Sequence, residues 1–178
     1  MCNMNTKIII SVFVAFLYST NTFSQEQSDK FQLQEISNER KHSYSVFRTD
    51  YYICTGIAYA KSIGMTVQDF AKFVASKHSM TSSRDTSIAA IMRTLHMVTT
   101  TYPSGIFKIL NQSETKSYMI WNRPYASYFK SGTVLGVSLD EFETYLYGHI
   151  DIMTKRIGVN FNYNIKGDTV YGNLSRYR

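Results

Sequence analysis

The sequence predicts an α+β domain with two layers: three N-terminal helices, a β-hairpin, a long helix and a second hairpin, with the two hairpins forming a four-stranded antiparallel sheet. Two observations support this prediction. Apolar residues recur at helical spacing through residues 46–100. Residues 159–174 instead alternate apolar and polar side chains, which is the period of a strand with one buried face.

The first 24 residues have the composition of a secretory signal peptide. A short polar start with one lysine, Lys7, precedes an apolar run at residues 8–18, and Thr22 and Ser24 are small residues suited to cleavage before Gln25. The apolar run is too short to span a bilayer comfortably. We therefore predict an exported protein, periplasmic or secreted, without stable membrane insertion after cleavage. A retained signal that anchors the chain is the alternative.

The remaining chain has the length of one domain. Residues 25–43 are polar, with both signs of charge and little periodicity, and predict a flexible arm ahead of a single α+β domain at residues 44–178. Only Cys54 remains after cleavage, so no disulfide can form within the mature chain. The net charge of +6 comes from scattered lysines and arginines rather than from a basic stripe, so no nucleic-acid partner is predicted.

The three helices are expected at residues 46–63, 66–78 and 86–100. Gly64 follows the first helix at the position of a C-terminal cap. Thr66 and Asp69 have the spacing of a capping box at the start of the second helix. A DNA-binding helix-turn-helix would conflict with export, so the first two helices predict a plain helical hairpin.

Two strands are expected next, at residues 106–110 and 118–123, with the polar loop 111–117 between them. Pro124 ends the second strand because its ring lacks the N–H that a ladder needs. Residues 125–136 form an aromatic-rich connector, with one helical turn and a loop.

The longest helix is predicted at residues 139–157. Ser138 is its N-cap, Asp140 and Glu141 place negative charge in its first turn, and Gly158 ends it. The terminal hairpin follows, with Gly167 at a turn position that needs positive φ. One face of that hairpin is apolar, and we expect it to cover a helix layer; its residues are Val159, Phe161, Tyr163, Ile165, Val170, Gly172 and Leu174.

The chain from about residue 103 to 175 resembles the C-terminal part of the 4-vinyl-reductase-like domains and is similar to the L-2-amino-thiazoline-4-carboxylic acid hydrolase-like family. The resemblance comes from a helix opened by residues 138–142 and ended by Gly158, followed by a hairpin with Gly167 and Asp168 at its turn. It implies an α+β domain that holds a small organic molecule between helices and sheet. Members of those families carry cysteines in this region, and this sequence has none after Cys54, which puts any thiol-dependent activity in doubt.

Two histidines are candidate catalytic residues. His149 lies on the predicted helix 139–157 at helical spacing from four apolar or aromatic residues, and His96 lies on the ridge of Ile88 and Met92. Either could serve as a general base, although a core histidine bonded to a carbonyl or a tyrosine is the simpler alternative. No HExxH, paired CxxC or His-x-His motif occurs, so neither a metal nor a cofactor is predicted.

The segment WNRPYASYF, residues 121–129, is the strongest candidate for ligand binding. Its aromatic residues Trp121, Tyr125 and Tyr128 surround Arg123 where the chain leaves the predicted sheet. An arginine among aromatic rings suits a planar carboxylate, although a solvated arginine beside core aromatics is the alternative. Asp50, on a mostly apolar helix, is a candidate pocket carboxylate, or else a partly exposed acid paired with a basic residue.

The sequence identifies no reaction and leaves the oligomeric state open. Our prediction is a small-molecule-binding module of the cell envelope that holds an amphiphilic or aromatic ligand between helices and sheet. One alternative is a hydrolase of a small cyclic substrate that uses a histidine as general base. The other is a surface domain whose tyrosines bind another polypeptide.

Overall fold

The computed structural model describes residues 37–77 and 87–177. The predicted signal peptide and residues 25–36 of the predicted arm lie outside the described residues. Residues 38–43, also assigned to that arm, belong instead to the first helix, α2, which spans Asn38–Ser62. The predicted arm was too long because residues 38–43 lack a local apolar pattern. A tertiary contact holds this part of the helix instead: His42 Nε2 lies 2.7 Å from the carbonyl oxygen of Thr101.

The order of elements confirms the predicted α+β class. Among the described residues, three helices precede the first strand: α2, α3 (Val67–Lys77) and α4 (Ile88–Thr100). The first hairpin comprises β1 (Phe107–Gln112) and β2 (Lys116–Asn122), and the 3-10 helix η1 (Pro124–Phe129) follows it. Helix α5 (Leu139–Lys155) leads into the second hairpin, β3 (Val159–Lys166) and β4 (Thr169–Arg176).

Two further predictions are wrong: which helix is longest, and how long the loop of the first hairpin is. The longest helix of residues 37–77 and 87–177 is α2 with 25 residues, not α5 with 17. The loop of the first hairpin is also shorter than residues 111–117, because Asn111 and Gln112 pair with Tyr118 and Ser117. A local hydrogen-bonded turn makes this possible: the backbone N–H of Ser113 donates to the Lys116 carbonyl over 2.7 Å.

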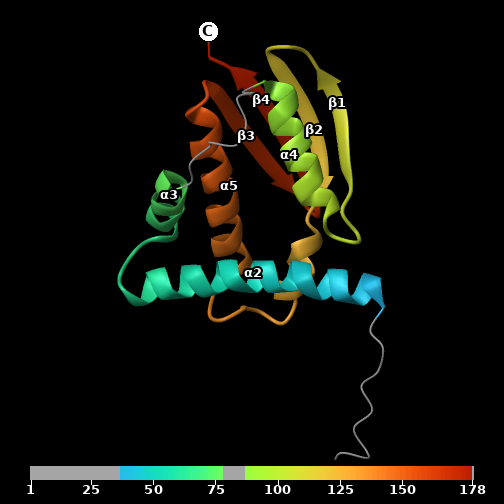
Figure 1. The fold of residues 1–178 in the computed structure, drawn as a ribbon. Helices are drawn as coiled ribbons and strands as arrows, with labels where there is room; N and C mark the ends of the chain where they lie inside the picture. The colour runs from blue at the N-terminus through green and yellow to red at the C-terminus, as the bar shows by residue number, and fades with distance from the viewer. Residues whose placement is uncertain (1–36, 78–86, 178) are drawn as a thin grey trace, which may run out of the picture. The chain divides into compact units, whose positions relative to one another are not determined.

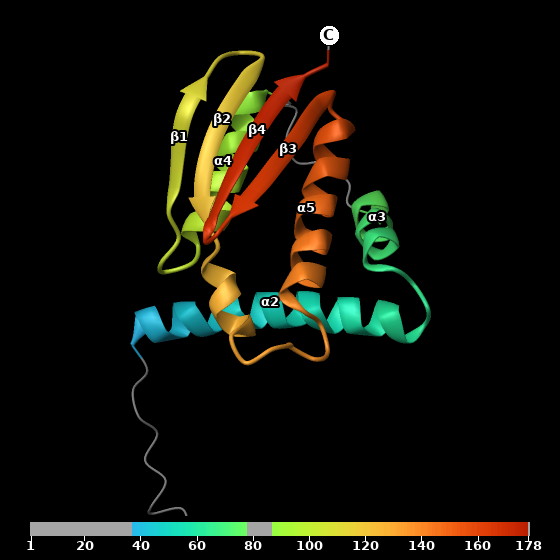
Figure 2. The same ribbon diagram turned by 180° about the vertical axis from the view of Figure 1, so that it is seen from behind.

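The four strands form one antiparallel sheet in the order β1-β2-β4-β3. The two hairpins therefore meet through β2 and β4, while β1 and β3 lie at the edges. Helices α4 and α5 cover one face of the sheet, and no helix of the described residues covers the other (Figure 1; Figure 2). Helix α2 crosses one end of these layers, and α3 lies beside α5.

The main core fills the space between the sheet and the two covering helices. Val159 and Phe161 of β3 are buried in it, and the alternating asparagines of that strand face outward, as the sequence predicts. Gly172 of β4 has a packing role, because an added Cβ would lie 2.7 Å from Trp121 Cη2. The remaining core residues are Ile88, Met92, Met119, Tyr147, Val170 and Leu174.

A second apolar cluster lies between α2, η1 and the start of α5. Cys54 is buried there, as expected of a small apolar residue, and burial followed by the nearby Asp50 charge raises the pKa of its thiol to about 11. The other buried members are Ile57, Val67, Tyr125, Phe129, Val137 and Phe142. A thiol with this pKa is almost entirely protonated at physiological pH, so the nucleophilic thiolate form of Cys54 is scarce.

Helix α5 begins with the predicted N-cap. The hydroxyl of Ser138 accepts from the Glu141 backbone N–H, and the Glu141 carboxylate accepts from the Ser138 N–H, so both halves of a capping box are present. Lys61 of α2 forms an ion pair of 2.6 Å with the same carboxylate. This contact joins the end of α2 to the start of α5.

Within the described residues, no helix has both the length and the apolar character needed to cross a membrane.

Candidate functional site

A cavity of about 320 Å³ lies where α2 crosses the end of the helix and sheet layers. Helices α2, α4 and α5 provide most of its walls, and the end of β2 and the start of η1 complete them. The lining is mainly apolar and aromatic, with Val46, Ile53, Leu95, Trp121, Tyr125, Phe142, Leu146, Tyr147 and Ile150 among its residues. Such a composition is typical of a pocket for a small organic molecule.

Three of the residues predicted to bind ligand line this cavity: Asp50, Trp121 and Tyr125. Asp50 comes from the buried face of α2, Trp121 from the inner face of β2, and Tyr125 from the first turn of η1. They reach one site because α2 lies across the point where the chain leaves the sheet. The other two predicted ligand-binding residues, Arg123 and Tyr128, lie outside the lining.

Asp50 is the acidic residue of the cavity. Its side chain is 5% exposed, and the hydroxyl of Tyr102 donates to both of its carboxylate oxygens, over 2.8 and 3.0 Å. Burial raises the pKa of this carboxyl to about 6, and the hydrogen bond from Tyr102 opposes that shift. The physical cause is the loss of water around the charged form. The sequence-based alternative, an exposed acid paired with a basic residue, is wrong for Asp50, because its side chain is turned into the core.

Arg123 binds a carboxylate of the protein itself. Its Nε and Nη2 groups donate to the two carboxylate oxygens of Glu143 over 2.6 and 2.9 Å, and its Nη1 donates to the Gly167 carbonyl over 3.0 Å. This two-point pairing with a carboxylate is the geometry in which guanidinium groups bind most strongly. The carboxylate that Arg123 was expected to bind on a ligand is therefore supplied by Glu143 of α5.

A tyrosine pair extends this polar cluster to the wall of the cavity. The Tyr125 hydroxyl donates to Glu143 Oε1 over 2.9 Å and lies 2.7 Å from the Tyr147 hydroxyl. Burial raises the pKa of both phenols, that of Tyr147 to about 12, so both are neutral at physiological pH. The chain of bonds from Arg123 to Tyr147 therefore holds two cavity-lining tyrosines in fixed orientations.

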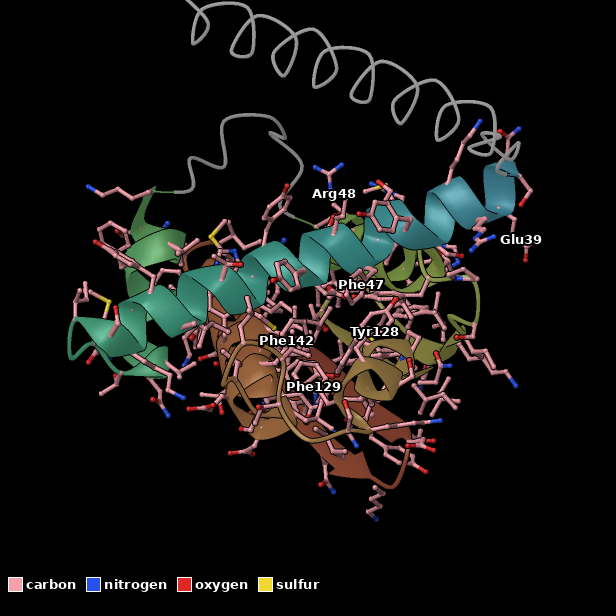
Figure 3. The ribbon with its side chains drawn as sticks, turned by 90° about the horizontal axis from the view of Figure 1, so that it is seen from below. Glu39, Phe47, Arg48, Tyr128, Phe129 and Phe142 are labelled. Atoms are coloured by element: carbon pink, nitrogen blue, oxygen red, sulfur yellow. The ribbon has the colours of Figure 1, made fainter. Side chains whose placement is uncertain are left out.

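Tyr128 belongs to the apolar cluster beneath α2. Figure 3 labels four aromatic residues of this region: Phe47 of α2, Tyr128 and Phe129 of η1, and Phe142 of α5. The Tyr128 ring meets Phe47 edge-on at 5.2 Å between centroids, and Phe129 lies 5.4 Å from Phe142. Tyr128 therefore packs against α2 in the second apolar cluster and does not form part of the cavity wall.

Neither candidate catalytic histidine lines the cavity. His149 is half-buried on α5 and stacks on Tyr145, with 6.0 Å between ring centroids. His96 is exposed on α4 and meets the Phe107 ring edge-on at 5.5 Å. Neither imidazole therefore belongs to the set of side chains that line the cavity with Asp50.

Sequence reasoning missed most residues of the cavity lining, among them His42, Tyr102 and Tyr147, and it missed Glu143, which bonds to the lining residue Tyr125. His42 was assigned to the flexible arm, and Tyr102 follows the expected end of a helix, so neither gave a local signal. Glu143 and Tyr147 did give a local signal. They are four residues apart on the apolar face of α5, and a carboxylate on such a face needs a polar or charged partner.

Among the described residues, no group of three or more histidine, cysteine or acidic side chains is arranged to hold a metal ion. The prediction that the protein has no cofactor stays a prediction. The arrangement offers an apolar chamber with one buried carboxylate and three tyrosine hydroxyls, from Tyr102, Tyr125 and Tyr147.

No protein-family model matches this chain. No curated protein matches it either. Among solved structures, it is similar to a mutant H-NOX protein from K. algicida in the Fe(II) unliganded form, with 10% sequence identity and a TM-score of 0.36. The match covers 63% of this chain and 62% of the H-NOX chain, so this chain spans less than two thirds of that protein's length. A likeness at this level carries no argument about function.

Proposed function

We propose that this chain is an exported small-molecule-binding module of the cell envelope, which holds an amphiphilic or aromatic ligand in the cavity between α2 and the helix and sheet layers. The observation that supports the proposal is the cavity itself: about 320 Å³, walled by apolar and aromatic side chains, with few polar groups at its surface. Pockets that bind small organic ligands share this combination, and 320 Å³ suits a ligand at the small end of their range.

Native mass spectrometry of the protein purified from its own envelope tests this proposal. We expect a bound small molecule on the intact protein and its release on unfolding. The same measurement gives the mass of the chain, and we expect a start at Gln25, after removal of the predicted signal peptide. A chain that retains residues 1–24 would contradict cleavage of the signal peptide and would favour the membrane-anchored alternative.

Two threonines of α2 supply a matched pair of variants. Thr49 and Thr55 are both exposed, and each hydroxyl donates to the carbonyl of the residue four positions earlier. Thr49 lines the cavity and Thr55 does not. We expect Thr49→Trp to lose the retained molecule because the indole enters the cavity, whereas Thr55→Trp keeps it. Equal retention by both variants, or a wild-type protein that carries no small molecule, would refute the proposal.

The hydrolase alternative has less support. It needs a histidine within hydrogen-bond reach of a pocket that also holds a polar partner. His149 and His96 lie outside the cavity lining. His42 does line the cavity, but its Nε2 lies 2.7 Å from the Thr101 carbonyl oxygen, and the acid of the cavity, Asp50, accepts from the Tyr102 hydroxyl. No observation therefore favours this alternative over the binding module.

The outer face of the sheet favours the interaction alternative. In the four strands, all of which the structure describes, the side chains that face away from the helices include exposed Tyr118 and Tyr171 together with Lys108, Lys116 and Lys166, and none is acidic. An acidic segment of another polypeptide would suit this face. If native mass spectrometry finds a bound polypeptide that Tyr171→Asp releases, this alternative replaces the binding module.

A further inference from the structure

Among the described residues two carboxylates are buried, Asp50 and Glu143, and they differ in how their charge is compensated. Glu143 is 7% exposed and is held by the guanidinium of Arg123 and the hydroxyl of Tyr125. Asp50 is 5% exposed and receives one donor, the Tyr102 hydroxyl. A carboxylate has about four lone-pair sites, so Asp50 can accept further hydrogen bonds.

Among the described residues, no cationic side chain pairs with Asp50. Within residues 37–77 and 87–177, no lysine, arginine or histidine forms an ion pair with it. The cavity lining, all of it described, contains neither lysine nor arginine, and Asp50 is its one acid. His42 also lines the cavity, but it is exposed and its Nε2 lies at the Thr101 carbonyl. A buried carboxylate without a cation is costly, and its cost falls when a positive partner enters the same space.

The surroundings of Asp50 suit an ammonium group attached to an apolar body. The aromatic residues of the lining are Tyr102, Trp121, Tyr125, Phe142 and Tyr147. Their ring faces attract cations, and their area covers an apolar ligand. A primary or secondary ammonium also brings the N–H donors that the free lone pairs of Asp50 can accept.

We infer that the cavity is selective for small aromatic or alkyl amines, with Asp50 as the counter-ion of the ligand's ammonium group and Tyr102 fixing the carboxylate in place. This inference rests on the proposed function, because it names the ligand class of the same cavity. The sequence had suggested a ligand with a carboxylate, bound by Arg123. Because Glu143 occupies Arg123 and the acidic Asp50 lines the cavity, the inferred ligand carries a positive charge instead.

Three probes of nearly equal size test the inference: phenethylamine, phenethyl alcohol and phenylacetate. The protein is stripped of bound molecules by unfolding and refolding, and affinities are measured by isothermal titration calorimetry near neutral pH. A charge-assisted hydrogen bond to a buried carboxylate is worth about 1.5–3 kcal/mol, so we expect the amine to bind about ten- to hundredfold more tightly than the alcohol. Phenylacetate is expected to bind most weakly, because its charge repels that of Asp50.

Two variants assign the preference to Asp50. In Asp50→Asn, whose side chain has the same shape without the charge, the amine should lose its advantage over the alcohol. In Asp168→Asn, which makes a like change in the exposed β3-β4 turn, the amine should keep it. Circular dichroism establishes that both variants are folded before the titrations.

Four other outcomes of these titrations would contradict the inference or the proposed function. Equal affinities for amine and alcohol in the wild-type protein would overturn the amine inference while leaving a small-molecule cavity in place. Tighter binding of phenylacetate would overturn it as well, and would indicate that protonated Asp50 donates to the ligand. If none of the three probes binds, the proposed function itself fails. An amine preference that survives in Asp50→Asn would remove Asp50 from its role.

Discussion

Replacing Asp50 by asparagine is expected to stabilise the ligand-free protein, although it removes a residue of the proposed site. The carboxyl of Asp50 has a pKa of about 6 in the folded chain, against 3.8 without the fold, because burial disfavours its charged form. The folded state therefore holds this proton more tightly than the unfolded state. The stability that the group contributes is fully present below pH 3.8 and is lost as the pH rises through about 6.

The magnitude follows from the size of the shift. A difference of about two units at about 1.4 kcal/mol per unit puts the cost of ionised Asp50 at about 3 kcal/mol. The amide introduced by the substitution brings two N–H donors that need partners in the buried site, which offsets about 1 kcal/mol of the gain. We therefore expect Asp50→Asn to raise the free energy of unfolding by about 2 kcal/mol near pH 7.5, and by close to zero near pH 4.5.

Urea denaturation of the wild-type and variant proteins at these two pH values measures the difference. Other groups near Asp50 do not titrate in this window: the pKa of Tyr102, Tyr128 and Cys54 is raised in each case, chiefly by burial. Asp168→Asn in the exposed turn is the control and should change stability by less than about 0.5 kcal/mol at either pH. A destabilised Asp50→Asn variant near pH 7.5 would refute the reasoning.

Three further substitutions test the packing around the site by urea denaturation. Gly172→Ala should cost about 2 kcal/mol and shift the fluorescence of Trp121, because the new Cβ overlaps the indole ring. Ser138→Ala removes one half of the capping box and should cost about 1 kcal/mol. Glu143→Gln leaves the guanidinium of Arg123 without its carboxylate and should cost about 3 kcal/mol.

Each of these predictions has a contrasting outcome. Gly148→Ala is the control for Gly172, because its Cβ would lie 3.7 Å from the Ala71 Cβ, an ordinary contact on α5. This control should leave stability unchanged or raise it slightly, since alanine is the better helix former. An equal loss in both glycine variants would show that the steric argument is wrong. A Glu143→Gln variant as stable as the wild type would mean that Arg123 finds another partner.

Local signals account for the parts of the fold that were predicted correctly. The capping residues of α5, the alternation along β3 and the positive φ of Gly167 each depend on a few neighbouring residues. The early start of α2 escaped prediction because the contact that holds it, between His42 and Thr101, joins residues 59 positions apart. Pattern alone also could not supply the order of the strands, in which β2 pairs with β4 from the other hairpin.

The sequence by itself determined the α+β class, the order of elements and which faces of the second hairpin are apolar, because hydrophobic period and turn chemistry are written in consecutive residues. Only the tertiary structure decided which polar groups meet. Asp50 and Tyr102 lie 52 positions apart, and Arg123 is 20 positions from Glu143. One carboxylate received an arginine and the other did not, and this difference depends on how α2 and α5 pack rather than on any local pattern.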